Sequence, residues 1–190
     1  MSTFKPLAVS VAVAALLSAC ATQMTDTVVP TRGPNLGRTP TPQEIRAADI
    51  SIPPSGAGLP AGSGDAKAGA QVYASKCLAC HGEKGAGKPA DALVGGIGSL
   101  ATPKPLRTVG SYWPYATTVW DYVNRAMPFN QPGTLRPDEV YAVSAYVLFL
   151  NDIVAEKQVL DARSLPLVKM PNRDGFISDP RPDVPGQPLR

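Results

Sequence analysis

Residues 77–81 read Cys77-Leu78-Ala79-Cys80-His81, and they decide the fold, because they hold two of the three cysteines and the one histidine of a 190-residue chain. A single histidine excludes metal centres that need two or more imidazoles. A zinc site here would lack a fourth ligand, since the remaining cysteine, Cys20, lies in the N-terminal segment that we expect to be a signal or a lipid anchor. A redox-active C-x-x-C pair needs no histidine beside it. The motif therefore indicates a cofactor that uses both thiols and the imidazole.

The pattern C-x-x-C-H is the attachment signature of c-type haem. Two thiols at this spacing can each add to one vinyl group of the same porphyrin, and the next residue then presents its imidazole to the iron. The covalent links let a small domain keep a large apolar cofactor. We predict one covalently bound haem c, with Cys77 and Cys80 in the thioether links and His81 as an axial ligand.

The chain around the motif is predicted to be all-α, with a haem domain at 64–152. Helices are expected at 66–76, at 116–126 and from Pro137 to about residue 151. Proline followed by two acids suits the first turn of a helix. The third helix has an apolar stripe at helical spacing, made of Val143, Tyr146, Val147 and Leu150.

Proline-rich segments flank this domain on both sides. Residues 20–63 contain seven prolines and are predicted to form a tether or strap. A capping-box pattern at Thr41-Pro42-Gln43-Glu44 predicts a short helix that runs to about Asp49. Residues 153–190 are predicted to be an extended tail, either disordered or packed as a strap.

Residues 1–19 are predicted to be an export signal. The apolar stretch 7–17 is too short for a bilayer span, which takes roughly 20 residues. The segment ends in Leu17-Ser18-Ala19-Cys20, which resembles the lipobox of bacterial lipoproteins, whose cysteine receives a diacylglyceryl group. The alternative is ordinary cleavage after Ala21, which would discard Cys20. We expect a periplasmic protein, either anchored to the membrane through Cys20 or soluble.

The second axial ligand follows by elimination. With one histidine in the chain, methionine, lysine or an open position remain. Met127 and Met170 are the rivals, and each precedes a proline. Met127 is favoured because it follows the second helix, where a loop can fold over the distal face of the haem. His/Met ligation predicts a low-spin iron with a comparatively raised reduction potential.

These features together resemble a class I cytochrome c, and the resemblance implies that fold. It rests on Gly69, Tyr73, the 77–81 motif, Met127 and Tyr146. In the family, a glycine faces an aromatic residue where the terminal helices cross, and Gly69 with Tyr146 match those roles.

One position departs from the family pattern. A class I cytochrome c usually has a proline whose carbonyl accepts a hydrogen bond from the proximal imidazole. Leu93 and Gly95 match that loop, but the position of the proline holds Asp91, and the nearest proline is Pro89. Which carbonyl orients His81 therefore stays open.

A narrower resemblance extends beyond the haem motif. Segments on both sides of the motif are similar to the SoxD-type cytochrome c subunit of SoxCD sulfur and sulfite dehydrogenases; they cover 33–38, 41–45, 108–116, 126–129, 138–142 and 170–176. In that family a molybdenum-cofactor subunit oxidises sulfite or sulfane sulfur, and the cytochrome takes the electrons. The resemblance also implies that Tyr112 and Trp113 contact the haem propionates, with loop packing as the equal alternative.

Two classes of function remain open. The first is an electron-transfer subunit that accepts electrons from a molybdenum-containing sulfite or sulfur dehydrogenase and passes them to a downstream cytochrome c or oxidase. The second is a free lipid-anchored carrier between respiratory complexes. An enzyme with an open haem position ranks third, and in the first two classes the chain does no chemistry on substrate by itself. The net charge of +3 gives no indication of nucleic-acid binding.

Overall fold

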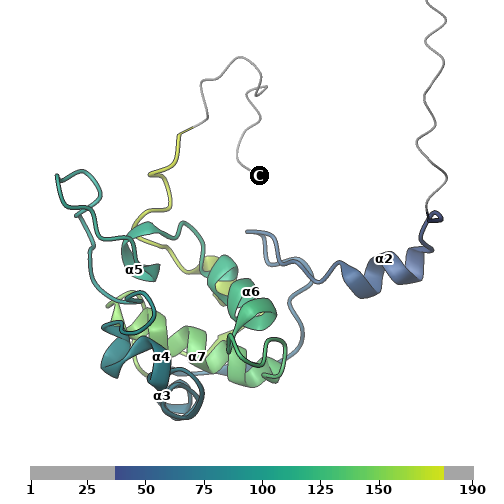
Figure 1. Ribbon diagram of the computed structural model, residues 1–190, viewed down its shortest axis with the longest axis horizontal. Coiled ribbons are helices and arrows are strands. Elements are labelled where there is room, and N and C mark those ends of the chain that lie inside the picture. Colours follow the sequence, from purple (N-terminus) through teal and green to yellow (C-terminus); the bar gives the residue numbers. More distant parts are fainter. Residues whose placement is uncertain (1–36, 178–190) are drawn as a thin grey trace, which may run out of the picture. The chain divides into compact units, whose positions relative to one another are not determined.

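The computed structural model describes residues 37–177 (Figure 1). The chain divides into two compact units between residues 44 and 45. The expected export signal, Cys20 and the last thirteen residues lie outside the described part. In the described residues, no helix is long and apolar enough to cross a membrane. The prediction of an all-α fold is confirmed: between residues 37 and 177, each of the two strands is only two residues long.

Three helices form the frame of the larger unit, as the sequence predicts. They are α3 (Ala66–Lys76), α6 (Ala116–Ala126) and α7 (Pro137–Leu150). The carboxylate of Asp65 caps α3 by accepting from the backbone N–H of Ala68 at 2.8 Å. At the start of α7, the carboxylate of Glu139 accepts from the backbone N–H of Arg136 at 2.8 Å.

Helices α3 and α7 cross at Gly69, where the backbones touch. A Cβ atom on Gly69 would lie 1.9 Å from the carbonyl oxygen of Ala142 and 2.8 Å from the Cβ of Tyr146. One turn further along, the rings of Tyr73 and Tyr146 pack with their centroids 5.3 Å apart. Glycine is therefore required at this crossing, and the aromatic pair fills the space beside it.

Short elements complete the fold. They are α2 (Pro42–Ala48), α4 (Leu78–His81), α5 (Val109–Tyr112), the 3₁₀ turns Glu83–Gly85 and Leu165–Leu167, and the strands β1 (Ser63–Gly64) and β2 (Leu160–Asp161). The two strands pair antiparallel, with Ser63 opposite Asp161. The sequence patterns predicted α2 but not α4, α5 or the strands, because elements of two to four residues have no periodicity to detect.

The segment before α3 packs against α6 and α7 as a strap. The backbone N–H of Ile52 donates to the carboxylate of Asp121 on α6 at 2.9 Å. The phenol of Tyr141 on α7 donates to the carbonyl of Pro60 at 2.9 Å. Ile52 is itself buried in the core. These contacts give the proline-rich stretch 51–62 a fixed path over the helices.

The segment after α7 also contributes to the core. Its buried apolar side chains are Val154, Leu160, Leu165, Val168 and Met170, and they join the cluster around Trp120 and Tyr141. Further on, the side-chain amide of Asn172 donates to the carbonyl of Tyr112 at 2.7 Å. In the described residues up to 177, the predicted tail is thus a strap whose buried apolar residues belong to the same core as the helices.

Candidate haem-binding site

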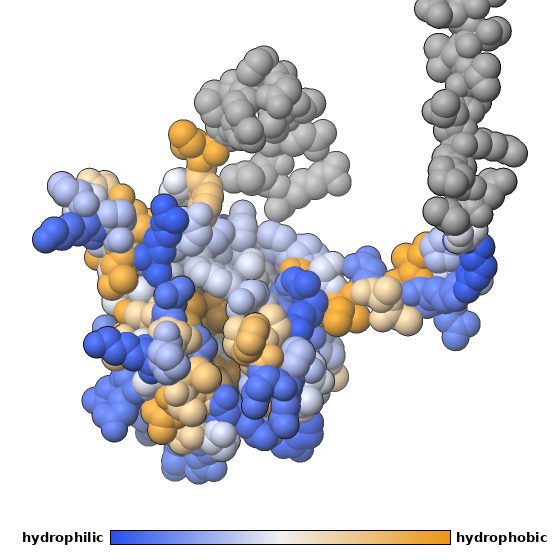
Figure 2. Space-filling model, in the orientation of Figure 1, coloured by the Kyte–Doolittle hydropathy of each residue, from blue (hydrophilic) through white to orange (hydrophobic). Residues whose placement is uncertain are grey.

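A cavity of about 770 Å³ opens on one face of the larger unit, between the Cys77–His81 segment and α6. This volume lies within the range of about 300–1,000 Å³ typical of ligand sites. Figure 2 shows the hollow, with hydrophobic residues in and around it. The lining includes Tyr73, Cys77, Cys80, His81, Leu93, Trp113, Tyr122, Val123, Met127 and Val147.

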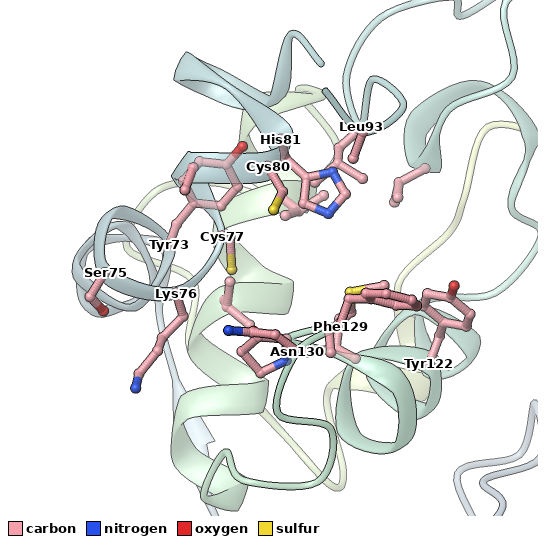
Figure 3. A pocket seen from close by; sticks show the side chains of 18 of the residues that line it. Tyr73, Ser75, Lys76, Cys77, Cys80, His81, Leu93, Tyr122, Phe129 and Asn130 are labelled. Atoms are coloured by element: carbon pink, nitrogen blue, oxygen red, sulfur yellow. The ribbon is translucent and has the colours of Figure 1, made fainter. Parts of the chain in front are cut away.

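The two thiols and the imidazole lie on one side of the cavity (Figure 3). Helix α3 ends at Lys76, and the backbone N–H of the next residue, Cys77, donates to the carbonyl of Tyr73 at 2.9 Å. The one-turn helix α4 follows, and the N–H of His81 donates to the carbonyl of Cys77 at 2.9 Å. The chain thereby turns Cys77, Cys80 and His81 toward the same space. Burial raises the pKa of the Cys77 thiol to about 11, and the nearby Cys80 adds to the shift.

The orientation of His81 is set by a backbone carbonyl. Its Nδ1 lies 3.2 Å from the carbonyl oxygen of Asp91. Because a carbonyl can only accept, Nδ1 carries the proton, and Nε2 is the nitrogen available to a metal. The loop thus uses Asp91 in the role that the resemblance gives to proline. A carbonyl acceptor needs no particular side chain, which explains why aspartate serves at this position.

The other side of the cavity comes from α6 and the residues after it. Met127 follows the last residue of α6, donates its N–H to the carbonyl of Val123 at 3.1 Å, and lines the cavity. Met170 is 3 % exposed, belongs to the hydrophobic core and does not line the cavity. Lys76 also borders the cavity, but Figure 3 shows its ammonium directed away from it. Of the rival ligands, Met127 is the one whose side chain meets the same space as His81.

The two predicted propionate contacts lie in different surroundings. Trp113 lines the cavity, and its ring meets the edge of Tyr122 with the centroids 5.5 Å apart. Tyr112 does not line the cavity. Its ring packs against Phe176 at 5.2 Å, and the guanidinium of Arg107 lies 5.6 Å from its centroid.

The sequence named Tyr73 only for the family resemblance, and it did not identify Phe129 or Asn151 as site residues. The hydroxyl of Tyr73 donates to the carbonyl of Gly82 at 2.8 Å and so fixes the turn after His81. Phe129 is 86 % exposed at the cavity mouth, two residues after Met127. Asn151 holds the loop 93–95 through its side-chain amide. Proximity to Cys77 and Met127 could have indicated the first two, but no local signal marks Asn151.

The residues present suit a haem c. Two thiols and an imidazole lie on one side of an apolar cavity, and a thioether lines it as well, which is the donor set of a thioether-linked haem with two axial ligands. In residues 37–177, no group of three or more histidine, cysteine or carboxylate side chains is arranged to hold a metal ion by itself.

Comparison with known proteins supports this interpretation. Residues 64–147 match the family described as cytochrome C oxidase, cbb3-type, subunit III. Among solved structures, the chain is similar to one in the crystal structure of the sulfane dehydrogenase SoxCD from Paracoccus pantotrophus, at 43% identity and a TM-score of 0.71. The match covers 78% of this chain and 74% of that one. No curated protein matches significantly.

Proposed function

The chain belongs to the class I cytochromes c and is similar to the cytochrome subunit of SoxCD, and from this premise we propose that it accepts electrons from a molybdenum-containing sulfite or sulfane dehydrogenase subunit. As a cytochrome c, it binds haem c and transfers electrons. We further propose the number of haems, the ligands of the iron, the type of partner and a membrane attachment.

The proposed site contains a single haem. Cys77 and Cys80 hold it through thioether bonds, and His81 and Met127 bind the iron from its two sides. Support comes from the cavity that these four side chains line together, and from the carbonyl of Asp91, which leaves Nε2 of His81 available. When bound, the haem supplies one-electron cycling between Fe(III) and Fe(II).

The partner is proposed from the extent of the similarity. A haem-domain match alone spans residues 64–147, which is less than half of the chain, whereas the SoxCD chain matches 78% of it. The similarity therefore includes flanking sequence, and in this structure the flanks pack on the helices through Ile52, Tyr141 and Leu165. A haem site by itself does not require these flanking straps. Similarity that extends beyond the haem domain therefore supports the same architecture around the haem in both chains, and with it the same type of partner.

The electron would leave or enter through the face that surrounds the cavity. Phe129, Tyr122 and Leu78 are exposed hydrophobic residues on its rim or beside it. Residues 64–152 carry eight basic and seven acidic side chains, so this domain has little net charge with which to steer a partner. We expect a small, weakly charged docking surface, as in many redox encounters.

Attachment to the outer side of a membrane is a further part of the proposal. Cys20 would carry the lipid after export to the periplasm. Growth with a radiolabelled fatty acid tests this: the wild-type chain should be labelled and sediment with membranes, whereas Cys20→Ser should be unlabelled and soluble. An unlabelled, soluble wild-type chain would instead indicate ordinary signal cleavage.

Purification from the native host with metal analysis tests the partner. A tag on the C-terminus should retain a second polypeptide, and the complex should contain one iron per cytochrome together with molybdenum. Iron without molybdenum, from a monomeric cytochrome, would favour the free lipid-anchored carrier. A sample prepared from His81→Ala cells serves as the control, because its iron should be lost or its haem spectrum altered, which assigns the iron of the wild-type complex to this site.

A further inference from the structure

The loop that orients His81 is fastened to α7 by one buried side chain. Asn151, the residue after the last turn of α7, is 4 % exposed. Its Oδ1 accepts from the backbone N–H of Gly95 at 3.1 Å. Its Nδ2 donates to the carbonyls of Leu93 at 3.1 Å and Val147 at 2.9 Å. Since the oxygen faces a donor and the nitrogen faces two acceptors, only one orientation of the amide satisfies all three bonds.

A second side chain holds the same loop from α5. Thr108 caps α5, and its hydroxyl donates to the carbonyl of Gly95 at 2.6 Å. Both backbone polar groups of Gly95 are therefore bonded to side chains of other elements. The φ angle of Gly95 is +95°, a conformation that favours glycine. We call Asn151 and Thr108 the Gly95 clamp.

The clamp is built into the packing. A Cβ atom on Gly110 of α5 would lie 2.1 Å from Oδ1 of Asn151, so glycine at this position leaves room for the amide. Two backbone bonds tie this region to the haem motif and to the turn after it. The N–H of Ala90, just before the loop, donates to the carbonyl of Cys80 at 2.9 Å, and the N–H of Leu93 donates to that of Gly85 at 2.8 Å. Between these two points, the carbonyl of Asp91 faces His81.

We infer that the Gly95 clamp positions the proximal ligand: it fixes the loop 91–95 to α5 and α7 so that the carbonyl of Asp91 accepts the Nδ1 proton of His81. This inference rests on His81 as an axial ligand, which belongs to the proposed function, and it does not depend on the partner. A hydrogen bond to Nδ1–H makes the imidazole a stronger donor to iron and favours Fe(III). A loosened loop should therefore raise the reduction potential.

The test uses the haem-loaded protein and two variants that release the loop, Asn151→Ala and Thr108→Val. Both should raise the reduction potential. Both should also accelerate the hydrogen exchange of the His81 Nδ1 proton, measured by NMR, by about tenfold or more. Thr108→Ser keeps the hydroxyl and should restore both values. Tyr141→Phe is the matched control, because it removes a hydrogen bond to a backbone carbonyl of the N-terminal strap without touching the loop.

Two results would overturn the inference. In the first, Asn151→Ala and Thr108→Val lower the unfolding midpoint but leave the reduction potential and the exchange rate of the His81 Nδ1 proton at wild-type values. The clamp would then stabilise the fold without positioning the ligand. The second is a shift of the same size in Tyr141→Phe. If Asn151→Ala does not fold, the reduction potential and the Nδ1 exchange rate of Thr108→Val, compared with those of Thr108→Ser, decide whether the clamp positions His81. Failure of the proposed ligation is distinguishable, since the wild-type spectrum would then lack a histidine-ligated haem.

Discussion

At the scale of single residues, the site depends on where two methionines lie. Both precede a proline, so their local sequences look alike. Met127 follows α6 and lines the cavity, whereas Met170 lies in the hydrophobic core with 3 % of its surface exposed. The same side-chain chemistry thus borders the proposed haem site in one place and packs in the core in the other.

Substitution of the two methionines should give opposite results. Met127→Ala should abolish the weak near-infrared sulfur-to-iron band and let carbon monoxide bind the reduced protein readily. Met170→Leu nearly conserves volume, so it should keep the band and cost less than about 1.5 kcal/mol in urea unfolding. Survival of the band in Met127→Ala and its loss in Met170→Leu would reverse the assignment.

At the scale of helices, the crossing of α3 and α7 carries the Cys77–His81 segment. α3 ends where the motif begins, so any separation of the two helices moves Cys77 relative to the wall that α7 forms with Val143 and Val147. Because Gly69 touches the backbone of Ala142, this crossing has no spare room. The geometry of this crossing therefore affects both the stability of the fold and the position of Cys77 in the site.

Gly69→Ala should disturb the fold and the site together. The new methyl group would overlap the carbonyl oxygen of Ala142, and we expect a loss of about 3 kcal/mol in the free energy of unfolding. The fraction of protein with covalently attached haem should fall as well. Ala68→Gly is the control on the exposed face of α3, and it should cost at most about 1 kcal/mol with normal haem attachment. Equal effects of the two substitutions would contradict the packing argument.

The short helix α2 makes a separate prediction about pH. The guanidinium of Arg38, followed by the backbone N–H and hydroxyl of Thr41, lowers the pKa of Glu44 from 4.5 to about 2. Because the pKa of Glu44 is lower in the folded chain, the ionised carboxylate stabilises the N-terminus of the helix. This contribution is fully present above about pH 4.5 and is lost as the pH falls through about 2.

An NMR titration of the Glu44 carboxyl should therefore show a midpoint well below the ordinary value. Arg38→Gln should shift it upward more than Thr41→Val does, because the ion pair is the largest cause. Added salt should reduce the shift, since both groups are at the surface. A wild-type midpoint near 4.5 at low salt would show that the pair and the capping box do not form in solution.

At the scale of the whole molecule, the straps before α3 and after α7 are parts of one folding unit with the helices. The strap 51–62 is bonded to Asp121 and Tyr141, and β1 pairs with β2 to connect the two flanks. The C-terminal strap adds Leu160 and Leu165, both fully buried, to the core. A haem domain cut at residues 64 and 152 would lose this packing.

Two leucines in the same 3₁₀ turn test the role of the C-terminal strap. Leu165 is fully buried, whereas Leu167 is 78% exposed. Leu165→Ala should lower the free energy of unfolding by about 2–5 kcal/mol, and Leu167→Ala should change it by less than about 0.5 kcal/mol. Thermal unfolding followed by circular dichroism measures both. Equal, small effects would mean that the strap is not part of the core in solution.

Some of this architecture could be predicted because the controlling interactions are local. Helices α3 and α6 were predicted with the bounds that the structure shows, since the spacing of side chains on one helical face is a local signal. The motif at residues 77–81 was equally readable, because its thiols and imidazole belong to one turn. The strap contacts could not be predicted, because the carboxylate of Asp121 and the N–H of Ile52 that donates to it are 69 residues apart in the sequence.

The sequence by itself determined the covalent chemistry available to this protein: two thiols at haem spacing, one imidazole, and helices long enough to form an apolar cavity. Only the tertiary structure decided which methionine borders that cavity and that Met170 is core. It also decided that the carbonyl of Asp91 orients His81 and that Asn151 holds the loop. The physical reason is that backbone carbonyls are the same in every residue. Their roles arise from long-range packing, which no local pattern of side chains encodes.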